Sequence, residues 1–267
     1  MALPKPSAAS AALVTGASSG IGAVLARLLA ERGHNLVLVA RREERLRALA
    51  DELSAAHGVR AEPVPADLAD AAQRAGVLER VEELGLEIEV LVNNAGFGAT
   101  RSLHRMRPER VVEMVRLNCE ALLDLQVRLS PGMVARGRGA ILNTASTAAF
   151  QPMPGNAAYA ATKAFVLSLS EATHAELAPH GVTVTALCPG PVKTEFAQAA
   201  GIEVSERAPE FIWTDVEKVA REGIEGLEQG KRVVVPGLLH RLGSLAGQHT
   251  PRSLALPVVR RVWRMGT

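Results

Sequence analysis

The chain has 267 residues, of which 48% are hydrophobic and 3% aromatic. This length suits one large α/β domain, and the hydrophobic share is enough to bury a sizeable core. The 30 basic and 28 acidic residues give a net charge of +2, which is too small to indicate a nucleic-acid partner. No stretch reaches the roughly 18 uninterrupted apolar residues of a membrane span. Residues 1–10 lack the apolar run of a signal peptide, so we expect a cytoplasmic protein.

Cysteine and histidine spacing excludes two further kinds of site. The two cysteines, Cys119 and Cys188, lack C-x-x-C spacing, so we expect buried side chains and no disulfide framework. The seven histidines show no ligand spacing, and the sequence predicts no metal site.

Short β-branched runs alternate with helical patterns along the chain. In chain order, we expect a strand at residues 11–15, a helix at 20–32, a strand at 35–40, a helix at 43–57, a strand at 59–64, a helix at 70–84, a strand at 88–93, a helix within 108–131, a strand at 139–145, a helix within 157–179, a strand at 182–187, a helix at 215–229 and a strand at 232–235. Thr214 and Glu217 predict a capping box for the helix at 215–229. The alternation predicts an α/β fold with right-handed crossovers and a single doubly wound parallel sheet of about seven strands.

A glycine-rich turn lies between the first predicted strand and the first predicted helix. Its spacing is Gly16-x-x-x-Gly20-x-Gly22, with Ser18 and Ser19 as hydroxyl donors. Glycines let the backbone approach a diphosphate, and the following helix presents free N–H groups at its positive end. An ordinary strand–helix turn is the alternative interpretation of this segment by itself.

Tyr159 and Lys163 are four residues apart in a predicted helix and therefore share one face. A nearby ammonium favours phenolate, so we expect Lys163 to lower the Tyr159 pKa. Tyr159 is the only tyrosine of the chain. Ser146 follows a predicted strand, at the edge where α/β sheets bind ligands, and could orient a substrate oxygen. Considered by itself, the Tyr159–Lys163 spacing is also typical of a solvated pair on a helix.

Four further motifs lie along the chain: Asp67-Leu68, Asn93-Asn94-Ala95-Gly96, Asn118 and Pro189-Gly190-Pro191. With these, residues 11–235 resemble the classical short-chain dehydrogenase/reductase family. The resemblance implies a Rossmann-type fold, a nicotinamide cofactor and hydride transfer between a ketone or aldehyde and an alcohol. It implies four catalytic residues. Tyr159 is the proton donor or acceptor, and Ser146 orients the substrate. Lys163 also bonds the nicotinamide ribose, and Asn118 holds a water of a proton relay.

The resemblance also assigns the cofactor contacts. It implies that Asp67 bonds the adenine amino group and that Leu68 lies behind the ring. For Asn93, it implies a role in supporting the sheet as much as in binding the cofactor. The remaining implied contacts come from the glycine-rich turn, the end of the fourth strand, the catalytic helix and the loop after the sixth strand, where the carboxamide is held for pro-S transfer: Gly16, Ser18, Ser19, Gly20, Ile21, Gly22, Asn94, Ala95, Gly96, Tyr159, Lys163, Pro189, Gly190, Val192 and Thr194.

The end of the second strand indicates which nucleotide binds. An acid there would accept bonds from the adenosine ribose, whereas an arginine accommodates a 2′-phosphate. This chain has Arg41-Arg42 and no acid at that position. By resemblance, Arg41 is the main phosphate partner, with Arg42 and Ser18 as helpers. The alternative is that both arginines are solvated residues at a helix start, and this is the better interpretation of Arg42 considered by itself. The missing carboxylate favours NADP(H) over NAD(H).

Substrate contacts are expected from residues 98–103, 147–154 and 195–213. The aromatic and methionine side chains in or beside these segments indicate either lids packed on the core or an apolar pocket for a hydrophobic ketone or secondary alcohol: Phe97, Phe150, Met153, Phe196, Phe211 and Trp213.

The last part of the chain differs in charge. Residues 231–267 hold seven lysines and arginines and no acid. We expect residues 1–237 to form one domain and 238–267 a basic amphipathic helical extension that is not an independent domain. The extension is interpreted as an arm sealing the cleft or contacting a dimer partner, as an interfacial helix on anionic lipid, or as a solvated tail.

The resemblance implies a homodimer or homotetramer built on the helices within 108–131 and 157–179. Apolar stripes at helical spacing suit such an interface or an intrachain core: Leu122, Leu125, Leu129, Phe165, Leu169 and Ala172. Two rival functions are a non-catalytic NADP-binding scaffold or sensor and a sugar-nucleotide epimerase. The intact catalytic set argues against the scaffold, and the short segment after Pro189 argues against the epimerase.

Overall fold

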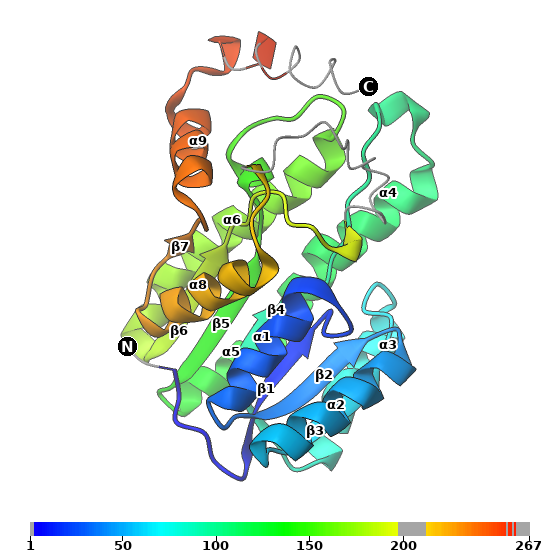
Figure 1. The fold of residues 1–267 in the computed structure, drawn as a ribbon, viewed down its shortest axis with the longest axis vertical. Coiled ribbons are helices and arrows are strands. Elements are labelled where there is room, and N and C mark those ends of the chain that lie inside the picture. The colour runs from blue at the N-terminus through cyan, green and yellow to red at the C-terminus, as the bar shows by residue number, and fades with distance from the viewer. Residues whose placement is uncertain (1–2, 197–211, 255, 258, 260–267) are drawn as a thin grey trace.

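The central strands of the sheet are apolar because helices cover both of their faces. The structure is a computed structural model and describes residues 3–196, 212–254, 256, 257 and 259. Within these residues, seven parallel strands form one sheet in the order β3-β2-β1-β4-β5-β6-β7 (Figure 1). They are β1 (Ser10–Thr15), β2 (Asn35–Ala40), β3 (Ala61–Pro65), β4 (Glu87–Asn93), β5 (Gly139–Thr144), β6 (Val182–Leu187) and β7 (Val233–Val234). This confirms the predicted doubly wound α/β fold.

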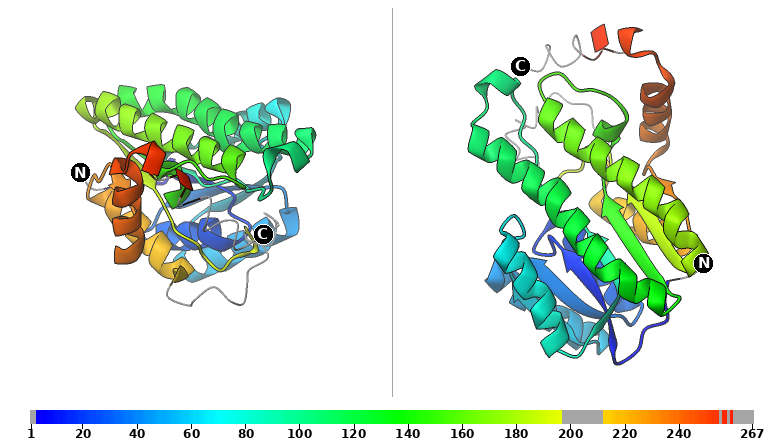
Figure 2. Two further views of the ribbon diagram at one scale, coloured as in Figure 1. Left: turned by 90° about the horizontal axis from the view of Figure 1, so that it is seen from above. Right: turned by 180° about the vertical axis from the view of Figure 1, so that it is seen from behind.

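Helices pack on both faces of the sheet (Figures 1 and 2). One face carries α1 (Gly20–Glu31), α2 (Glu43–His57) and α8 (Val216–Glu228), which share one hydrophobic cluster with the strands. The other face carries α3 (Ala71–Glu83), α5 (Leu122–Ala135) and α6 (Ala157–Leu177). Among the described helices, none is long and apolar enough to cross a bilayer.

Shorter helical segments lie mostly at the carboxyl end of the sheet. The helix α4 (Pro108–Val115) runs through a π-helical segment, η2 (Arg116–Ala121), directly into α5. Three 3₁₀ turns are η1 (Leu103–Arg105), η3 (Thr147–Phe150) and η4 (Ala178–His180). Helix α9 (Leu238–His249) contacts η3 beyond the end of β7.

One crossover contradicts the sequence prediction. The helix α1 connects β1 to β2, while α8 connects β6 to β7 in the opposite direction along the sheet, yet both helices pack on the same face. The two connections therefore have opposite hands, and the expectation of right-handed crossovers throughout is wrong at this edge. Residues 188–215 separate β6 from α8, a connection long enough for the chain to return on either face.

The start of α8 and the start of β3 also differ from the predictions. Asp215, not Thr214, caps α8, since its side chain accepts a hydrogen bond from the Lys218 N–H at 3.0 Å. The Thr214 N–H is bonded to the Pro191 carbonyl, which places Thr214 in a β-bridge. Strand β3 begins at Ala61 because its ladder with β2 begins there.

The helix predicted within residues 108–131 continues to Ala135 through Pro131. Proline lacks an N–H and leaves the carbonyl four residues earlier without its helical partner. That residue is Val127, which is 58% exposed, so solvent can satisfy the carbonyl. The sequence rule that proline ends a helix fails here because the affected turn faces water.

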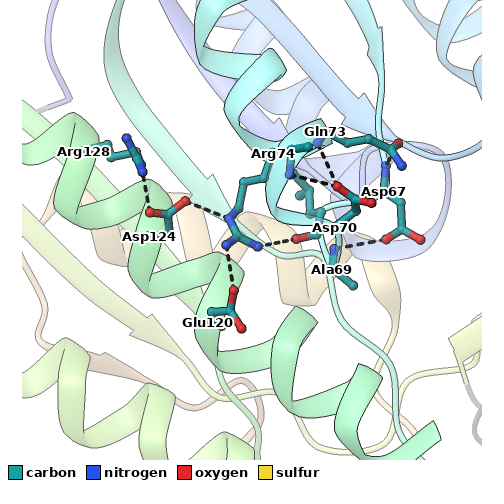
Figure 3. Close-up of polar contacts among 10 residues, drawn as sticks. Asp67, Ala69, Asp70, Gln73, Arg74, Glu120, Asp124 and Arg128 are labelled. Atoms are coloured by element: carbon teal, nitrogen blue, oxygen red, sulfur yellow. Dashed lines mark hydrogen bonds and ion pairs between the residues drawn. The ribbon is translucent and has the colours of Figure 1, made fainter. Parts of the chain in front are cut away.

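Arg74 on α3 connects the loop after β3 to the long helix (Figure 3). Arg74 is 4% exposed, and its guanidinium donates to Glu120 at 2.8 Å, to Asp124 at 2.7 Å and to the Leu68 carbonyl at 2.8 Å. A buried cation is tolerated only when it is paired and hydrogen-bonded. This network fixes the loop that carries Asp67 and Leu68 at the edge of the sheet.

Candidate active site

A cleft of about 870 Å³ opens at the carboxyl ends of the strands. Ligands bind at this edge in open α/β sheets because loops from both halves converge there. Most of the residues predicted to contact substrate or cofactor line it: Gly16, Ser18, Ser19, Gly20, Ile21, Arg41, Arg42, Asp67, Leu68, Asn94, Ala95, Gly96, Ser146, Tyr159, Lys163, Pro189, Gly190, Val192 and Thr194. Gly22 and Asn118 are not among the lining residues and act from behind it.

The glycine-rich turn has the geometry of a phosphate cradle. Gly16 and Gly20 adopt φ of 68° and 57°, a left-handed region that favours glycine. A Cβ on Gly22 would lie 2.3 Å from the Gly16 carbonyl oxygen, so the helix can approach the turn only through glycine. Ser19 caps α1 in extended conformation without a side-chain hydrogen bond to the helix. The turn and the first N–H groups of α1 therefore fit a dinucleotide diphosphate.

The loop after β4 is tied to this turn. The Thr15 hydroxyl accepts hydrogen bonds from the N–H groups of Asn94 and Ala95 at 2.9 and 3.0 Å. The Asn94 amide donates to the Thr15 carbonyl at 3.1 Å. Asn93, in contrast, points into the sheet and donates to Asn143 at 2.9 Å, so its place is structural.

The two arginines after β2 have different surroundings. Arg41 is exposed and lies 3.9 Å from Asp67 and 3.8 Å from Glu113. Arg42 donates to the hydroxyls of Ser18 and Ser19, at 3.0 and 2.6 Å, and is thereby fixed on the glycine-rich turn. Arg42 is exposed at the start of α2, and these bonds place it beside the turn; its role toward a phosphate stays a prediction.

Tyr159, Ser146 and Lys163 meet on the inner wall of the cleft. Ser146 follows β5 and its hydroxyl accepts from the Ala148 N–H at 3.1 Å. The buried Lys163 donates from Nζ to the Thr144 carbonyl at 2.7 Å, and Nζ lies 5.8 Å from the centre of the Tyr159 ring. The first turns of α6 thus carry the phenol and the ammonium on one face, as predicted from their spacing.

Burial controls the ionisation of both groups. It raises the pKa of Tyr159 from 10.0 to about 12, and a hydrogen bond with Ser146 opposes this rise. It lowers the pKa of Lys163 from 10.5 to about 8. The direction is opposite to the lowered pKa expected for Tyr159. Burial disfavours the phenolate, and the Lys163 ammonium is directed at the Thr144 carbonyl.

Asn118 is buried in the π-helical segment, and its amide bonds both a backbone carbonyl and a side-chain hydroxyl. It donates to the Phe97 carbonyl at 3.0 Å and to the Thr162 hydroxyl at 3.1 Å. A Cβ on Gly96 would lie 2.9 Å from Asn118 Oδ1 and 3.6 Å from Lys163 Nζ. Asn118 and Lys163 therefore flank a strip of backbone that only glycine allows. A water-holding role for Asn118 stays a prediction.

The open half of the cleft is mostly apolar. Of the side chains predicted there, Phe97, Phe150, Met153, Phe196 and Trp213 line it, and Phe211 lies outside the described residues, as do 197–210 of the predicted substrate segment. The Phe196 ring lies 5.8 Å from that of Tyr159, centre to centre. This wall suits a hydrophobic compound close to the tyrosine.

Helix α9 forms another side of the cleft. Leu239, His240, Gly243 and Ser244 line it, and the His240 ring lies so close to Gly190 that a Cβ there would be 2.6 Å away. This placement favours the sealing arm among the interpretations of the extension. The later residues 258 and 260–267, which hold three of its arginines, lie outside the described residues.

Sequence reasoning missed several residues that shape the site. Thr15 directly precedes the first glycine of the turn. Its position could have indicated this role, because a hydroxyl at the end of a strand can bind a neighbouring loop. Asn143 bridges Asn93, Gln126 and Ser170 inside the sheet, and no local pattern indicates this. Glu195, which bonds Arg42 at 2.7 Å, is distant from it in sequence.

The sequence predicted neither a metal site nor a disulfide framework. Among the described residues, no cluster of three or more histidines, cysteines or acids is present. Both cysteines are free, and burial raises the pKa of Cys119 to about 11 and of Cys188 to about 12. Neither thiol is therefore activated as a nucleophile.

Comparison with known proteins agrees with this geometry. The family model for short chain dehydrogenases matches residues 10–222. An uncharacterised oxidoreductase of Myxococcus xanthus is 41% identical over 187 residues, which span 69% of this chain and 72% of that protein. The 3-oxoacyl-[acyl-carrier-protein] reductase of Staphylococcus aureus is 36% identical over 198 residues, spanning 73% and 80% of the two chains.

Two solved structures extend the comparison. A short-chain dehydrogenase from Sphingobium yanoikuyae in complex with NADPH has 38% identity and a TM-score of 0.81, covering 89% of this chain and 92% of that one. An alcohol dehydrogenase from Comamonas testosteroni, specific for bulky-bulky ketones, has 32% identity and a TM-score of 0.76, covering 97% and 94%. The chain belongs to the short-chain dehydrogenase family of oxidoreductases, which binds a nicotinamide cofactor.

Proposed function

We propose that the protein is an NADP(H)-dependent oxidoreductase that interconverts a ketone or aldehyde with the corresponding alcohol, with Tyr159 as the proton donor or acceptor. The observation that carries the proposal is the convergence of Tyr159, Ser146 and Lys163 in the same cleft as the phosphate cradle. A bound nicotinamide would supply or accept the hydride. The chain's own residues hold the carbonyl and move the proton.

Each side chain has a distinct task in this reaction. Ser146, hydrogen-bonded with Tyr159, orients the substrate oxygen. Tyr159 stays protonated up to a pKa of about 12 and donates its proton as negative charge develops on that oxygen. Lys163 is held by the Thr144 carbonyl behind the tyrosine and, when charged, stabilises the phenolate that remains.

Two observations support NADP(H) as the preferred cofactor. No acid follows β2, where Arg41 and Arg42 line the cleft beside Ser18. A guanidinium pairs well with a phosphate through charge-assisted hydrogen bonds. The related Sphingobium enzyme, which binds NADPH, supports the same choice.

The apolar wall supports a hydrophobic substrate. Phe150, Met153, Phe196 and Trp213 line the cleft, and α9 adds Leu239. The relative from Comamonas that accepts bulky-bulky ketones has a comparable chain length and covers the extension as well. We therefore propose a bulky, largely apolar ketone or secondary alcohol.

The test is a screen of ketones, aldehydes and alcohols with NADPH and NADP⁺, followed by absorbance of the reduced cofactor. Tyr159→Phe is the matched variant, since it keeps the ring and removes the hydroxyl. Turnover of the best substrate should fall at least ~100-fold in Tyr159→Phe, the scale of general acid catalysis. NADPH affinity should change little. Tight NADPH binding without turnover of any compound would instead support a non-catalytic scaffold.

We also propose that the protein is a homo-oligomer. Leu122 and Leu125, predicted as interface stripes, are buried in the intrachain core. The same long helices nevertheless expose Phe165 of the predicted stripe, together with Val112, Val115, Leu123 and Val127. A two-fold axis would cover this patch with its own copy. Light scattering should give a multiple of 28.2 kDa, and a monomer at micromolar concentration would contradict the proposal.

A further inference from the structure

Glu195 lies between two arginines at the cofactor end of the cleft. It follows Thr194 in the segment after β6, and its carboxylate accepts from Arg42 Nη1 at 2.7 Å and from Arg45 Nη1 at 2.8 Å. Thr194 itself lies 3.4 Å from the position of a Cβ on Gly20. The segment therefore runs alongside the glycine-rich turn, and Glu195 reaches from it to the start of α2.

Every nitrogen of the Arg42 guanidinium already donates a hydrogen bond in this arrangement. Nε and Nη2 donate to the Ser18 hydroxyl at 3.2 and 3.0 Å, Nη2 also donates to Ser19, and Nη1 donates to Glu195. Only the second N–H of Nη1 is left, so a phosphate that forms a bidentate pair with Arg42 must replace one of these partners. Of these partners, only the Glu195 carboxylate is negatively charged. Like a phosphate, it is an anion whose oxygens accept hydrogen bonds from the guanidinium.

The exchange is energetically accessible. The side chains of Arg42 and Glu195 are 43% and 48% exposed, and exposed ion pairs contribute little to stability. A 2′-phosphate carries more charge than a carboxylate and forms stronger hydrogen bonds with a guanidinium. The two arginines hold the pKa of Glu195 at about 2, so the carboxylate remains charged at any ordinary assay pH.

Resting on the proposed NADP(H) dependence, we propose that Glu195 is a specificity-determining residue for the cofactor. It acts as an intramolecular counterion that occupies the place on Arg42 taken by the 2′-phosphate. Glu195 therefore opposes NADP(H) binding and leaves NAD(H) binding unaffected, so it lowers the preference set by Arg41 and Arg42.

A different role would leave a different signature. If Glu195 mainly fastened the segment after β6 over the cofactor, its loss would weaken both nucleotides, because both share the diphosphate. Competition for Arg42 acts only on the nucleotide that carries the 2′-phosphate. The ratio of the two affinities separates these roles.

The experiment is equilibrium titration of NADPH and NADH, followed by nucleotide fluorescence and by calorimetry. Glu195→Gln keeps the shape and removes the charge. Glu43→Gln is the control, because Glu43 is an exposed acid of α2 that pairs with Arg47 and not with Arg42 or Arg45. We expect Glu195→Gln to tighten NADPH binding by about two- to fivefold, the worth of an exposed charge contact. NADH binding and both affinities of Glu43→Gln should stay unchanged.

A double-mutant cycle with Arg42→Ala locates the effect. The gain from Glu195→Gln should vanish when Arg42 is absent. Weaker binding of both nucleotides, an unchanged NADPH affinity, or a gain that persists without Arg42 would each overturn the inference. Wild-type protein that binds neither nucleotide would overturn the proposed function and this inference with it. Wild-type binding of NADPH followed by any of the three other results overturns the inference alone.

Discussion

Asn118 and Phe97 exchange two hydrogen bonds in the manner of a base pair. The Asn118 amide donates to the Phe97 carbonyl at 3.0 Å, and the Phe97 N–H donates to Asn118 Oδ1 at 3.1 Å. The pair joins the π-helical segment to the loop after β4 and holds Gly96 beside Lys163. A local departure from α-helix is common where a helix serves a site, and here it aims an amide at buried backbone.

Asn118→Ala should therefore destabilise the fold as well as slow the reaction. The change leaves the buried N–H and carbonyl of Phe97 without partners, at a cost of about 1–3 kcal/mol for an unsatisfied buried group. Urea denaturation would measure this loss. Arg116→Ala, at an exposed position of the same helical run, is the control and should change little. An unchanged unfolding midpoint in Asn118→Ala would show that the pair is dispensable.

The sequence predicted those parts of the fold that depend on local pattern. Strands β1 and β2 are buried on both faces, so their apolar runs were clear, and the turn at Gly16 and Gly20 needs left-handed glycines. The spacing of Tyr159 and Lys163 fixed their common face through helix geometry alone.

Other features depend on contacts that no local pattern contains. The partner of Arg42 is 153 residues away, and the face chosen by α8 depends on packing against α1. The raised Tyr159 pKa follows from burial, which spacing does not reveal. The position of α9 beside Gly190 likewise depends on the path of the chain after β7.

The pH dependence of ketone reduction should report Lys163 and not Tyr159. Tyr159 keeps its proton up to a pKa of about 12, whereas buried Lys163 loses its charge near 8. Reduction needs both protons in place, so kcat/KM should be level below pH 8 and fall above it. The profile should be measured with a fixed ketone and NADPH.

Lys163→Arg provides the control for that assignment, because a guanidinium stays charged throughout the range. Its residual activity should not decline near pH 8. A decline at the same pH in Lys163→Arg would assign the titration to another group.

Arg41 and Arg42 should differ in how they affect cofactor binding. Arg41 has only distant acidic partners, so Arg41→Ala should weaken NADPH by ~1.5–3 kcal/mol, the worth of a bond to a charged group, and spare NADH. Arg42 also holds the hydroxyls of Ser18 and Ser19 on the turn, so Arg42→Ala should weaken both nucleotides. Titration of both cofactors on both variants checks this. Equal losses in Arg41→Ala would make Arg41 structural.

Helix α9 should govern which substrates are accepted, not whether hydride is transferred. The four proposed catalytic residues precede it, yet it contributes Leu239 and His240 to the cleft wall. Truncation after Gly237 should raise KM for bulky apolar ketones and leave turnover of a small ketone largely intact. Gly190→Ala is the point variant that tests the same contact, because its Cβ would displace the His240 ring from 2.6 Å. It should shift KM in the same direction. Equal losses on small and bulky ketones after truncation would instead mean that α9 supports the fold around Gly190, since a wall that only selects substrates cannot slow those too small to touch it.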